Sequence, residues 1–218
     1  MSSGRALREQ VAGLLAAGDF AGLAALAGRQ RGIPEALLKF LYDPRDLLHW
    51  RAVEGLGRLA GVYPRQVQKV IGRLLWLLNE DSGSFGWGAA AALGEIGRGQ
   101  VSLVAEIIPM FCGFLEEKFS RAAALWGLGR LAQAHPELLG EVLPLAPPLL
   151  LDADPEVRAC AAWCLGQARY REAAVGLEAL LADGQEVLLY DGGELRRTTV
   201  GRVAGEALAA LQKPPRPH

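Results

Sequence analysis

A Leu-Gly pair recurs along the chain at nearly constant intervals of 37, 35 and 37 residues. The pairs are Leu56-Gly57, Leu93-Gly94, Leu128-Gly129 and Leu165-Gly166, followed by a partial fifth copy at Leu208-Ala209. Intervals of this size are typical of proteins built from stacked copies of one structural unit. Each copy in such a stack packs mainly on its neighbours. We therefore treat the four pairs as structural markers of a repeat and predict an all-α fold, an elongated α-solenoid.

The residues around each marker predict a pair of helices. The first helix is rich in alanine, as in RAAALWGLGRLA at 121–132, and the second carries apolar residues at helical spacing, as in VQKVIGRLLWLL at 67–78. Sixteen residues after the first three markers stand Gly72, Pro109 and Pro144. Because glycine and proline weaken a helix, we expect a bend in the second helix of these units. We place the second helices on the inner surface of the stack.

The stretch DADPEVRACAAWCLGQAR at 152–169 has an acid, a turn, Val-Arg, small residues and then Leu-Gly. This pattern resembles the HEAT-like repeat of the phycobiliprotein-lyase type, within the armadillo/HEAT superfamily. The resemblance covers about 43–211 and implies a superhelix of about five helical hairpins. The central stretch, with HWRAVEGLG and LLWLLNEDSGSFGWGA, also resembles an uncharacterised bacterial HEAT-like family. Such repeats serve many roles, so the resemblance implies a fold and no particular activity.

The marker and its flanking residues divide the chain into a cap and five repeats. We expect an N-terminal helical cap at 1–42 and a frayed tail at 212–218. Strand-like runs flank Asp191-Gly192-Gly193, a hairpin signal that predicts a small β-hairpin insertion over 187–200. The predicted repeats cover 43–80, 81–117, 118–152, 153–183 and 184–211.

Residues 79–88 read NEDSGSFGWG and lie between the first two repeats. A predicted helix precedes them, the Lys-Ser/Thr of a phosphate-binding loop is missing, and the glycine order differs from a dinucleotide-binding loop. Ser82 stands where Asp154 stands in a later repeat, so both are predicted helix N-caps. The segment is therefore interpreted as a turn between repeats, and nucleotide binding is rejected.

The same segment also has a functional interpretation, in which residues 79–88 form a binding rim between repeats. Gly86 stands where Arg121 and Arg158 stand in their repeats, which leaves space beside Trp87. Asn79, Glu80 and Asp81 would surround that space. It would admit a peptide, a cation or a basic side chain of a partner. The alternative is an ordinary turn with solvated acids.

Composition argues against several other functions. The chain has 23 basic and 24 acidic residues, whereas proteins that neutralise many phosphates are usually basic. Nucleic-acid binding would need a local patch of arginines, drawn from residues such as Arg65, Arg73 and Arg130. No His-Glu dipeptide occurs, so the di-iron site of one HEAT-like hydroxylase family does not carry over. Cys160 and Cys164 are interpreted as small buried hydrophobes. We therefore predict no catalytic residues, no metal and no cofactor.

Taken together, these features predict a non-catalytic scaffold that binds an unidentified protein through its concave helical surface and the 79–88 rim. One alternative is a small-ligand or metal binder, or a lyase-like enzyme accessory, that uses the acidic rim, and a second is a weak nucleic-acid binder. The chain shows no signal peptide or membrane helix, so we expect a cytoplasmic protein that does not bind membranes. The predicted partner-binding residues are Asn79, Glu80, Asp81, Ser82, Trp87, Trp50, Arg51 and Arg73.

Overall fold

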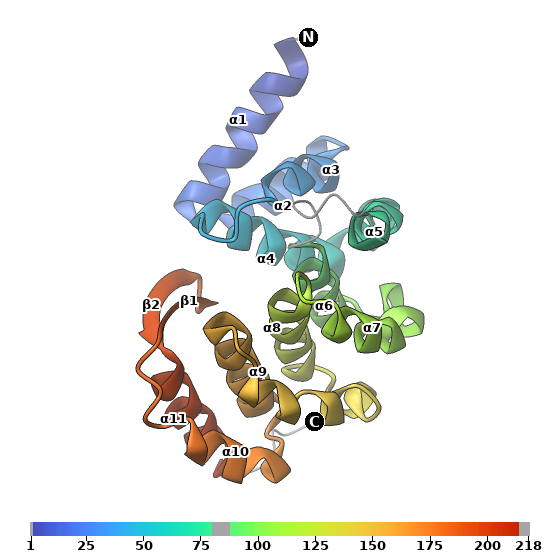
Figure 1. Ribbon diagram of the computed structural model, residues 1–218. Helices are drawn as coiled ribbons and strands as arrows, with labels where there is room; N and C mark the ends of the chain where they lie inside the picture. The colour runs from blue at the N-terminus through green and yellow to red at the C-terminus, as the bar shows by residue number, and fades with distance from the viewer. Residues whose placement is uncertain (1, 80–87, 214–218) are drawn as a thin grey trace.

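The computed structural model describes residues 2–79 and 88–213 (Figure 1). Almost every described element is helical. The α-helices are α1 (Ser2–Ala17), α2 (Phe20–Arg29), α3 (Ile33–Leu37), α4 (Leu47–Val62), α5 (Pro64–Asn79), α6 (Ala89–Gly99), α7 (Phe111–Glu116), α8 (Arg121–Ala132), α9 (Pro155–Ala168), α10 (Ala174–Ala179) and α11 (Val200–Leu211). Short 3-10 turns are η1 (Leu38–Phe40), η2 (Val101–Leu103), η3 (Ala105–Met110), η4 (Pro136–Leu139), η5 (Leu143–Leu145), η6 (Pro147–Leu151) and η7 (Arg171–Ala173).

A row of helices, α4, α6, α8, α9 and α11, forms the backbone of the molecule, and each helix packs on the next. The marker glycines explain this packing. A Cβ on Gly94 would lie 2.2 Å from the carbonyl oxygen of Gly127, and one on Gly166 would lie 2.7 Å from Cα of Ala207. The four marker leucines are completely buried. Small residues therefore let successive helices touch through their backbones, and the predicted α-solenoid is confirmed.

The second helices differ from the expectation of bent but continuous helices. Gly72 lies inside a continuous α5, but Pro109 lies in η3 and Pro144 lies in η5. Proline lacks the N–H of an α-helical hydrogen bond and clashes with the preceding turn. Residues 136–151 contain four prolines and form 3-10 turns in place of an α-helix. The expected bend at Pro144 is therefore wrong, because the chain forms separate short turns there.

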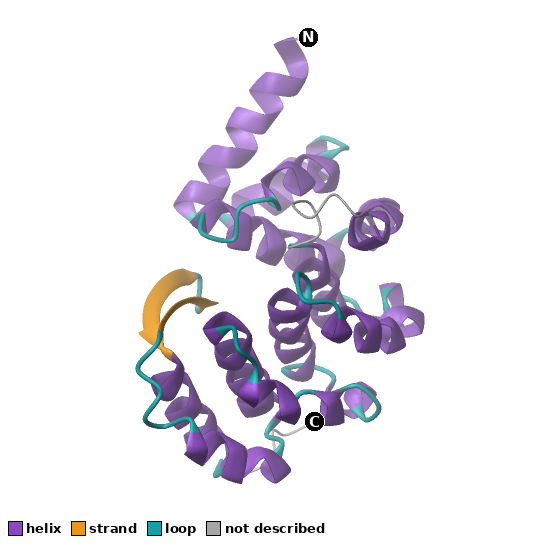
Figure 2. Ribbon diagram, viewed as in Figure 1, coloured by secondary structure: helices purple, strands orange, loops and turns teal. Residues whose placement is uncertain are grey.

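A two-stranded antiparallel hairpin lies on the inner side of the curved helical row (Figures 1 and 2). Strands β1 (Glu186–Asp191) and β2 (Glu194–Thr199) pair with Glu186 opposite Thr199. Gly192 and Gly193 form the turn with positive φ angles of 62° and 87°, as the Asp-Gly-Gly signal predicts. Figure 1 places α5 and α7 on the outer side of the row. The inner surface is thus formed by the marker-bearing helices, and its assignment to the second helices is wrong.

The N-terminal helices cover one end of the row, as predicted for a cap. Helices α1, α2 and α3 all pack on α4, and α1 projects away from the rest of the molecule (Figure 1). At the other end, Thr199 caps α11 by accepting a hydrogen bond from the Arg202 N–H, and Asp154 caps α9 in the same way. No described helix has both the length and the apolar character needed to cross a membrane. The boundaries between individual repeats stay a prediction.

Candidate functional site

Four aromatic side chains from distant parts of the sequence form a cluster on the inner face. The ring of Trp50, from α4, stacks on Tyr190 of β1 with 5.8 Å between centroids and an interplanar angle of 9°. Trp126 of α8 lies 4.8 Å from Trp50 and stacks on Trp163 of α9 at 5.8 Å. The Trp126 indole N–H also donates to the carbonyl oxygen of Tyr190 at 2.9 Å. The cluster fastens the hairpin to the helical row.

A cavity of about 180 Å³ opens beside this cluster. Residues preceding or beginning α4, α8 and α9 surround it, and β1 closes it on the hairpin side. Phe119, in the turn before α8, is 68% exposed. Trp50 is only 8% exposed, and its indole N–H donates to the Pro44 carbonyl at 2.8 Å. The lining residues are Pro44, Arg45, Trp50, Phe119, Ala122, Ala123, Glu156, Cys160 and Leu188.

One acid and one base stand among the mainly apolar residues of the cavity wall. Burial, followed by the nearby Asp154 carboxylate, raises the pKa of Glu156, and Arg45 acts in the opposite direction. Burial also raises the pKa of the Cys160 thiol far above its ordinary value. The thiol is therefore protonated and behaves as a small apolar group, as predicted for both Cys160 and Cys164.

Two buried carboxylates join the hairpin and three helices deeper in the same face. Glu54 accepts hydrogen bonds from the Tyr190 hydroxyl at 2.6 Å and from Arg58 at 2.7 Å. Glu95 is completely buried and is paired with Arg130. Burial would raise the pKa of Glu54, but the hydrogen bonds from Tyr190 and Arg58 lower it overall. Both acids are bound by fixed partners, so they stabilise the packing of α4, α6, α8 and β1.

Two arginine–acid pairs recur at equivalent positions of successive repeats. Arg121 pairs with Asp152, and Arg158 pairs with Asp183 at 2.8 Å. Arg121 also donates to the Leu115 carbonyl near the end of α7, and Arg158 donates to the Asp152 carbonyl before α9. Each pair therefore links the start of one marker helix to the last residue of the same predicted repeat.

The remaining residues of the predicted binding site are scattered. Arg51 donates to the carbonyl oxygens of Leu15 at 2.9 Å and Ala16 at 2.7 Å, and lies 3.6 Å from the Glu194 carboxylate. It thereby joins α1, α4 and the hairpin. Arg73 lies exposed on α5, on the outer side of the row. Asn79 is the last residue of α5, and Glu80, Asp81, Ser82 and Trp87 lie outside the described residues.

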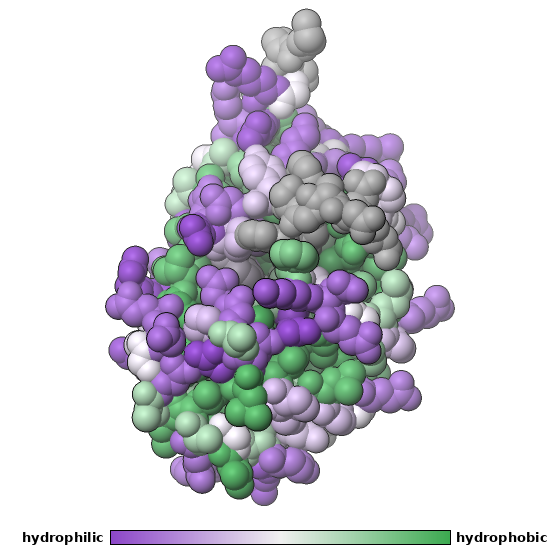
Figure 3. Space-filling view, in the orientation of Figure 1, coloured by the Kyte–Doolittle hydropathy of each residue, from purple (hydrophilic) through white to green (hydrophobic). Residues whose placement is uncertain are grey.

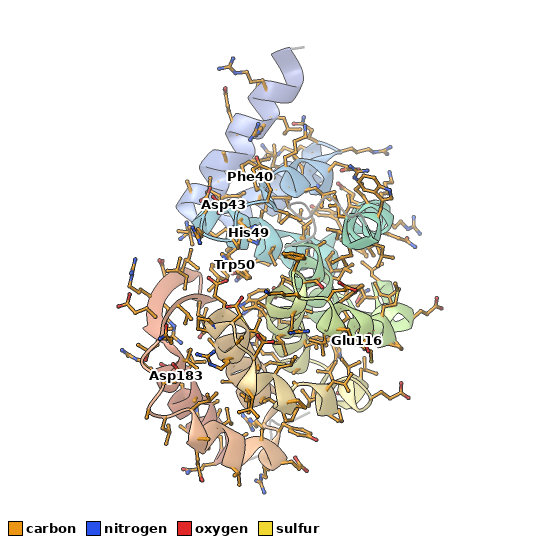
Figure 4. The ribbon with its side chains drawn as sticks, in the orientation of Figure 1. Phe40, Asp43, His49, Trp50, Glu116 and Asp183 are labelled. Atoms are coloured by element: carbon orange, nitrogen blue, oxygen red, sulfur yellow. The ribbon has the colours of Figure 1, made fainter. Side chains whose placement is uncertain are left out.

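His49 is a buried residue that the predicted site did not include. In Figure 4 it lies beside Trp50 at the start of α4, near Asp43. The side chain is 1% exposed, and neither ring nitrogen has a hydrogen-bond partner among the described residues. Burial lowers the pKa of His49 to about 4, although Asp43 and Asp46 partly offset this. The imidazole is therefore neutral near pH 7. The ring lies so close to Gly88 that a Cβ on residue 88 would clash with it. This contact cannot be predicted from the sequence.

The comparisons with known proteins agree with this architecture. The HEAT-like repeat family matches residues 119–168, which contain α8 and α9. An engineered protein of known crystal structure superposes with a TM-score of 0.60 at 20% identity, covering 97% of this chain and 91% of its own. A designed armadillo repeat protein, solved in complex with the peptide (KR)4, superposes with a TM-score of 0.56 at 21% identity. The superposition covers 97% of this chain and 92% of the designed protein.

The chain has the fold of a HEAT/armadillo-like repeat protein. An uncharacterised protein of the archaeon Archaeoglobus fulgidus is 33% identical to it over 101 residues, which are 46% of this chain. The chain spans about half the length of that relative, since the match covers 54% of the relative. Within the described residues, no three or more His, Cys, Asp or Glu side chains form a group suited to hold a metal ion.

Proposed function

We propose that this protein is a non-catalytic scaffold that binds a partner protein at the open part of its concave face. HEAT and armadillo-like folds typically serve as protein-interaction scaffolds and are generally non-enzymatic. The observation that carries the proposal is the cavity beside Trp50, with Phe119 exposed at its entrance. The hairpin already fills the neighbouring part of the same face. A partner therefore meets a short, bounded surface and not a continuous groove.

The size and lining of the cavity favour one inserted side chain. Pockets for cofactors and drug-sized ligands usually measure about 300–1,000 Å³. A cavity of about 180 Å³ is smaller and suits a single apolar anchor of the kind that dominates protein interfaces. Trp50 is held by Pro44, Trp126 and Tyr190, so the wall is rigid before binding. Glu156 at the cavity favours a basic group next to the partner's anchor.

The 79–88 rim is the second part of the proposal. It leads directly in the chain into α6, which stands between α4 and α8 in the row. A Cβ added to Gly88 would lie 2.7 Å from Cε1 of His49, which shows how closely the end of this segment meets α4. We include Asn79, Glu80, Asp81, Ser82 and Trp87 as partner contacts for this reason.

Site-specific photocrosslinking in the host cell tests the proposal. A photoreactive phenylalanine analogue replaces Phe119 in one sample and Leu151, which is 83% exposed on η6, in a control sample. We expect one protein to be crosslinked from position 119 and not from position 151. The variant Ala123→Phe, which fills the cavity, should abolish that crosslink while circular dichroism stays unchanged. A crosslink that survives Ala123→Phe, or an equal crosslink from position 151, would refute the cavity as the binding site.

A second variant separates the rim from the cavity. Asn79→Ala combined with Glu80→Ala and Asp81→Ala removes three polar side chains of the rim but leaves every cavity residue in place. Loss of the crosslink from position 119 in this variant would support a contact between the partner and the rim. An undiminished crosslink would limit the interface to the cavity.

A further inference from the structure

Helix α5 carries a row of unpaired positive charges on the outer side of the molecule. Arg65, Lys69 and Arg73 are spaced four residues apart, so they share one face of the helix, and all three are exposed. The helix contains no aspartate or glutamate. In the described part of the chain, none of the three side chains has a hydrogen bond or an ion pair. Other arginines of the protein, such as Arg121 and Arg158, are paired with acids.

One of these charges is held in place by an aromatic ring. The guanidinium carbon of Arg73 lies 3.7 Å from the centroid of the Trp76 ring, and Trp76 is 42% exposed. Stacking leaves the N–H edge of the guanidinium free, because a planar guanidinium donates in its own plane. Arg73 is therefore ordered before it meets a ligand, which lowers the entropic cost of binding a carboxylate.

The N-terminal end of the row opens into a groove of about 620 Å³ between α5 and the turn before α3. Arg31 contributes a further positive charge to this groove, and Glu35 contributes a negative charge. Val62 supplies an exposed apolar surface in the same groove. Hydrophilic side chains project from the edge of the molecule where α3 and α5 lie (Figure 3). The groove residues are Arg31, Gly32, Glu35, Val62, Tyr63, Pro64, Arg65, Gln66 and Lys69.

The spacing of the charges matches an extended acidic peptide. Residues four apart on an α-helix are separated by about 6 Å along its axis. Side chains at alternate positions of an extended chain point the same way and repeat about every 6.6 Å. We propose that the α5 row, Arg65, Lys69 and Arg73, together with the groove beside it, binds an extended segment of a protein with acidic residues at alternate positions.

The same features argue against nucleic acid as the occupant. Proteins that bind single strands without sequence preference combine a basic groove with aromatic rings on which bases stack. Here the Trp76 ring is covered on one face by Arg73. The whole chain also has a net charge of −1, which does not draw a polyanion over a distance. This surface lies on the opposite side of the helical row from the Trp50 cavity, so the inference does not depend on the proposed function.

Fluorescence anisotropy with two labelled probes tests the inference on the full-length protein. The first probe is a nine-residue peptide in which glutamate alternates with serine, and glutamine replaces glutamate in its neutral control. The second probe is a nine-nucleotide single-stranded DNA. At 50 mM salt we expect the acidic peptide to bind, the neutral peptide to bind at least tenfold more weakly, and 300 mM salt to weaken the acidic complex.

Substitutions locate the binding to the row. Arg65→Ser combined with Lys69→Ser and Arg73→Ser should weaken the acidic peptide about 10- to 100-fold, because each exposed ion pair accounts for about a two- to fivefold effect. Arg171→Ser, which removes an exposed charge near the other end of the molecule, should change the affinity less than twofold. Trp76→Leu should weaken binding about twofold without removing a charge. Circular dichroism should be unchanged in all variants, because the replaced side chains are exposed.

Three results would overturn the inference. The first is an acidic peptide that does not bind, or binds no better than the neutral peptide. The second is an affinity that the triple substitution leaves unchanged. The third is a single-stranded DNA that binds at least tenfold more tightly than the acidic peptide and depends on the same three residues, which would make the row a nucleic-acid site.

Discussion

Replacing Gly94 by alanine tests the packing on which the whole row of helices depends. An added Cβ would lie 2.2, 2.3 and 2.4 Å from the backbone O, C and Cα atoms of Gly127 in the next helix. Ordinary contact begins at 3.4 Å, so α6 and α8 would have to separate by about 1 Å. No flexible side chain can move aside, because the clash is with backbone on the neighbouring helix.

The size of the effect follows from two opposing contributions. Overpacking of a dense core costs about 1–3 kcal/mol, and a backbone clash belongs at the upper end of that range. Alanine gains about 1 kcal/mol over glycine inside a helix. We therefore expect Gly94→Ala to lower the free energy of unfolding by about 2 kcal/mol, and the melting temperature by about 4–8 °C for a chain of this length.

Gly72→Ala is a matched control for this substitution. Gly72 also lies inside a helix, but an added Cβ would meet nothing within 4 Å. Only the gain in helix propensity applies there, so Gly72→Ala should raise the free energy of unfolding by about 1 kcal/mol. The two variants should thus differ by about 3 kcal/mol in urea unfolding followed by tryptophan fluorescence and circular dichroism. Equal stability of the two, or a larger loss for Gly72→Ala, would refute this account of the Leu-Gly marker.

Three further predictions follow from the buried polar groups. Glu95→Gln should cost about 3 kcal/mol of unfolding free energy because it leaves Arg130 without its carboxylate, whereas Glu9→Gln on exposed α1 should cost less than about 1 kcal/mol in the same urea titration. Tyr190→Phe should cost about 1–3 kcal/mol by removing a hydrogen bond to buried Glu54, and a loss near zero would contradict a tight hairpin. Burial in the folded protein lowers the pKa of His49 from its ordinary value of 6.5 to about 4. Its contribution to stability is therefore complete above pH 6.5 and falls on acidification, by about 2 kcal/mol from pH 7 to pH 5. His49→Leu should remove that part of the pH dependence, and an unchanged slope would refute it.

Local signals were sufficient for much of the fold. The repeat of small residues before Leu-Gly predicts helices at each marker, and the structure has them. Asp191-Gly192-Gly193 predicts the hairpin turn because positive φ angles at consecutive positions favour glycine. Asp154 was predicted as a cap because capping involves only residues two or three apart. The cavity was not readable, because its lining comes from residues between 44 and 188.

The difference between the two layers of the solenoid shows where local signals end. The stacking of helical repeats can be predicted from local sequence, because periodic small residues allow close approach wherever they occur. Which layer lies inside the curve depends on the distance between successive helices in each layer. The Gly- and Ala-rich row packs backbone to backbone, and the layer of larger side chains and 3-10 turns lies on the outside. The position of the hairpin on the concave face depends on contacts between distant residues, since Tyr190 meets Glu54 across 136 residues of chain.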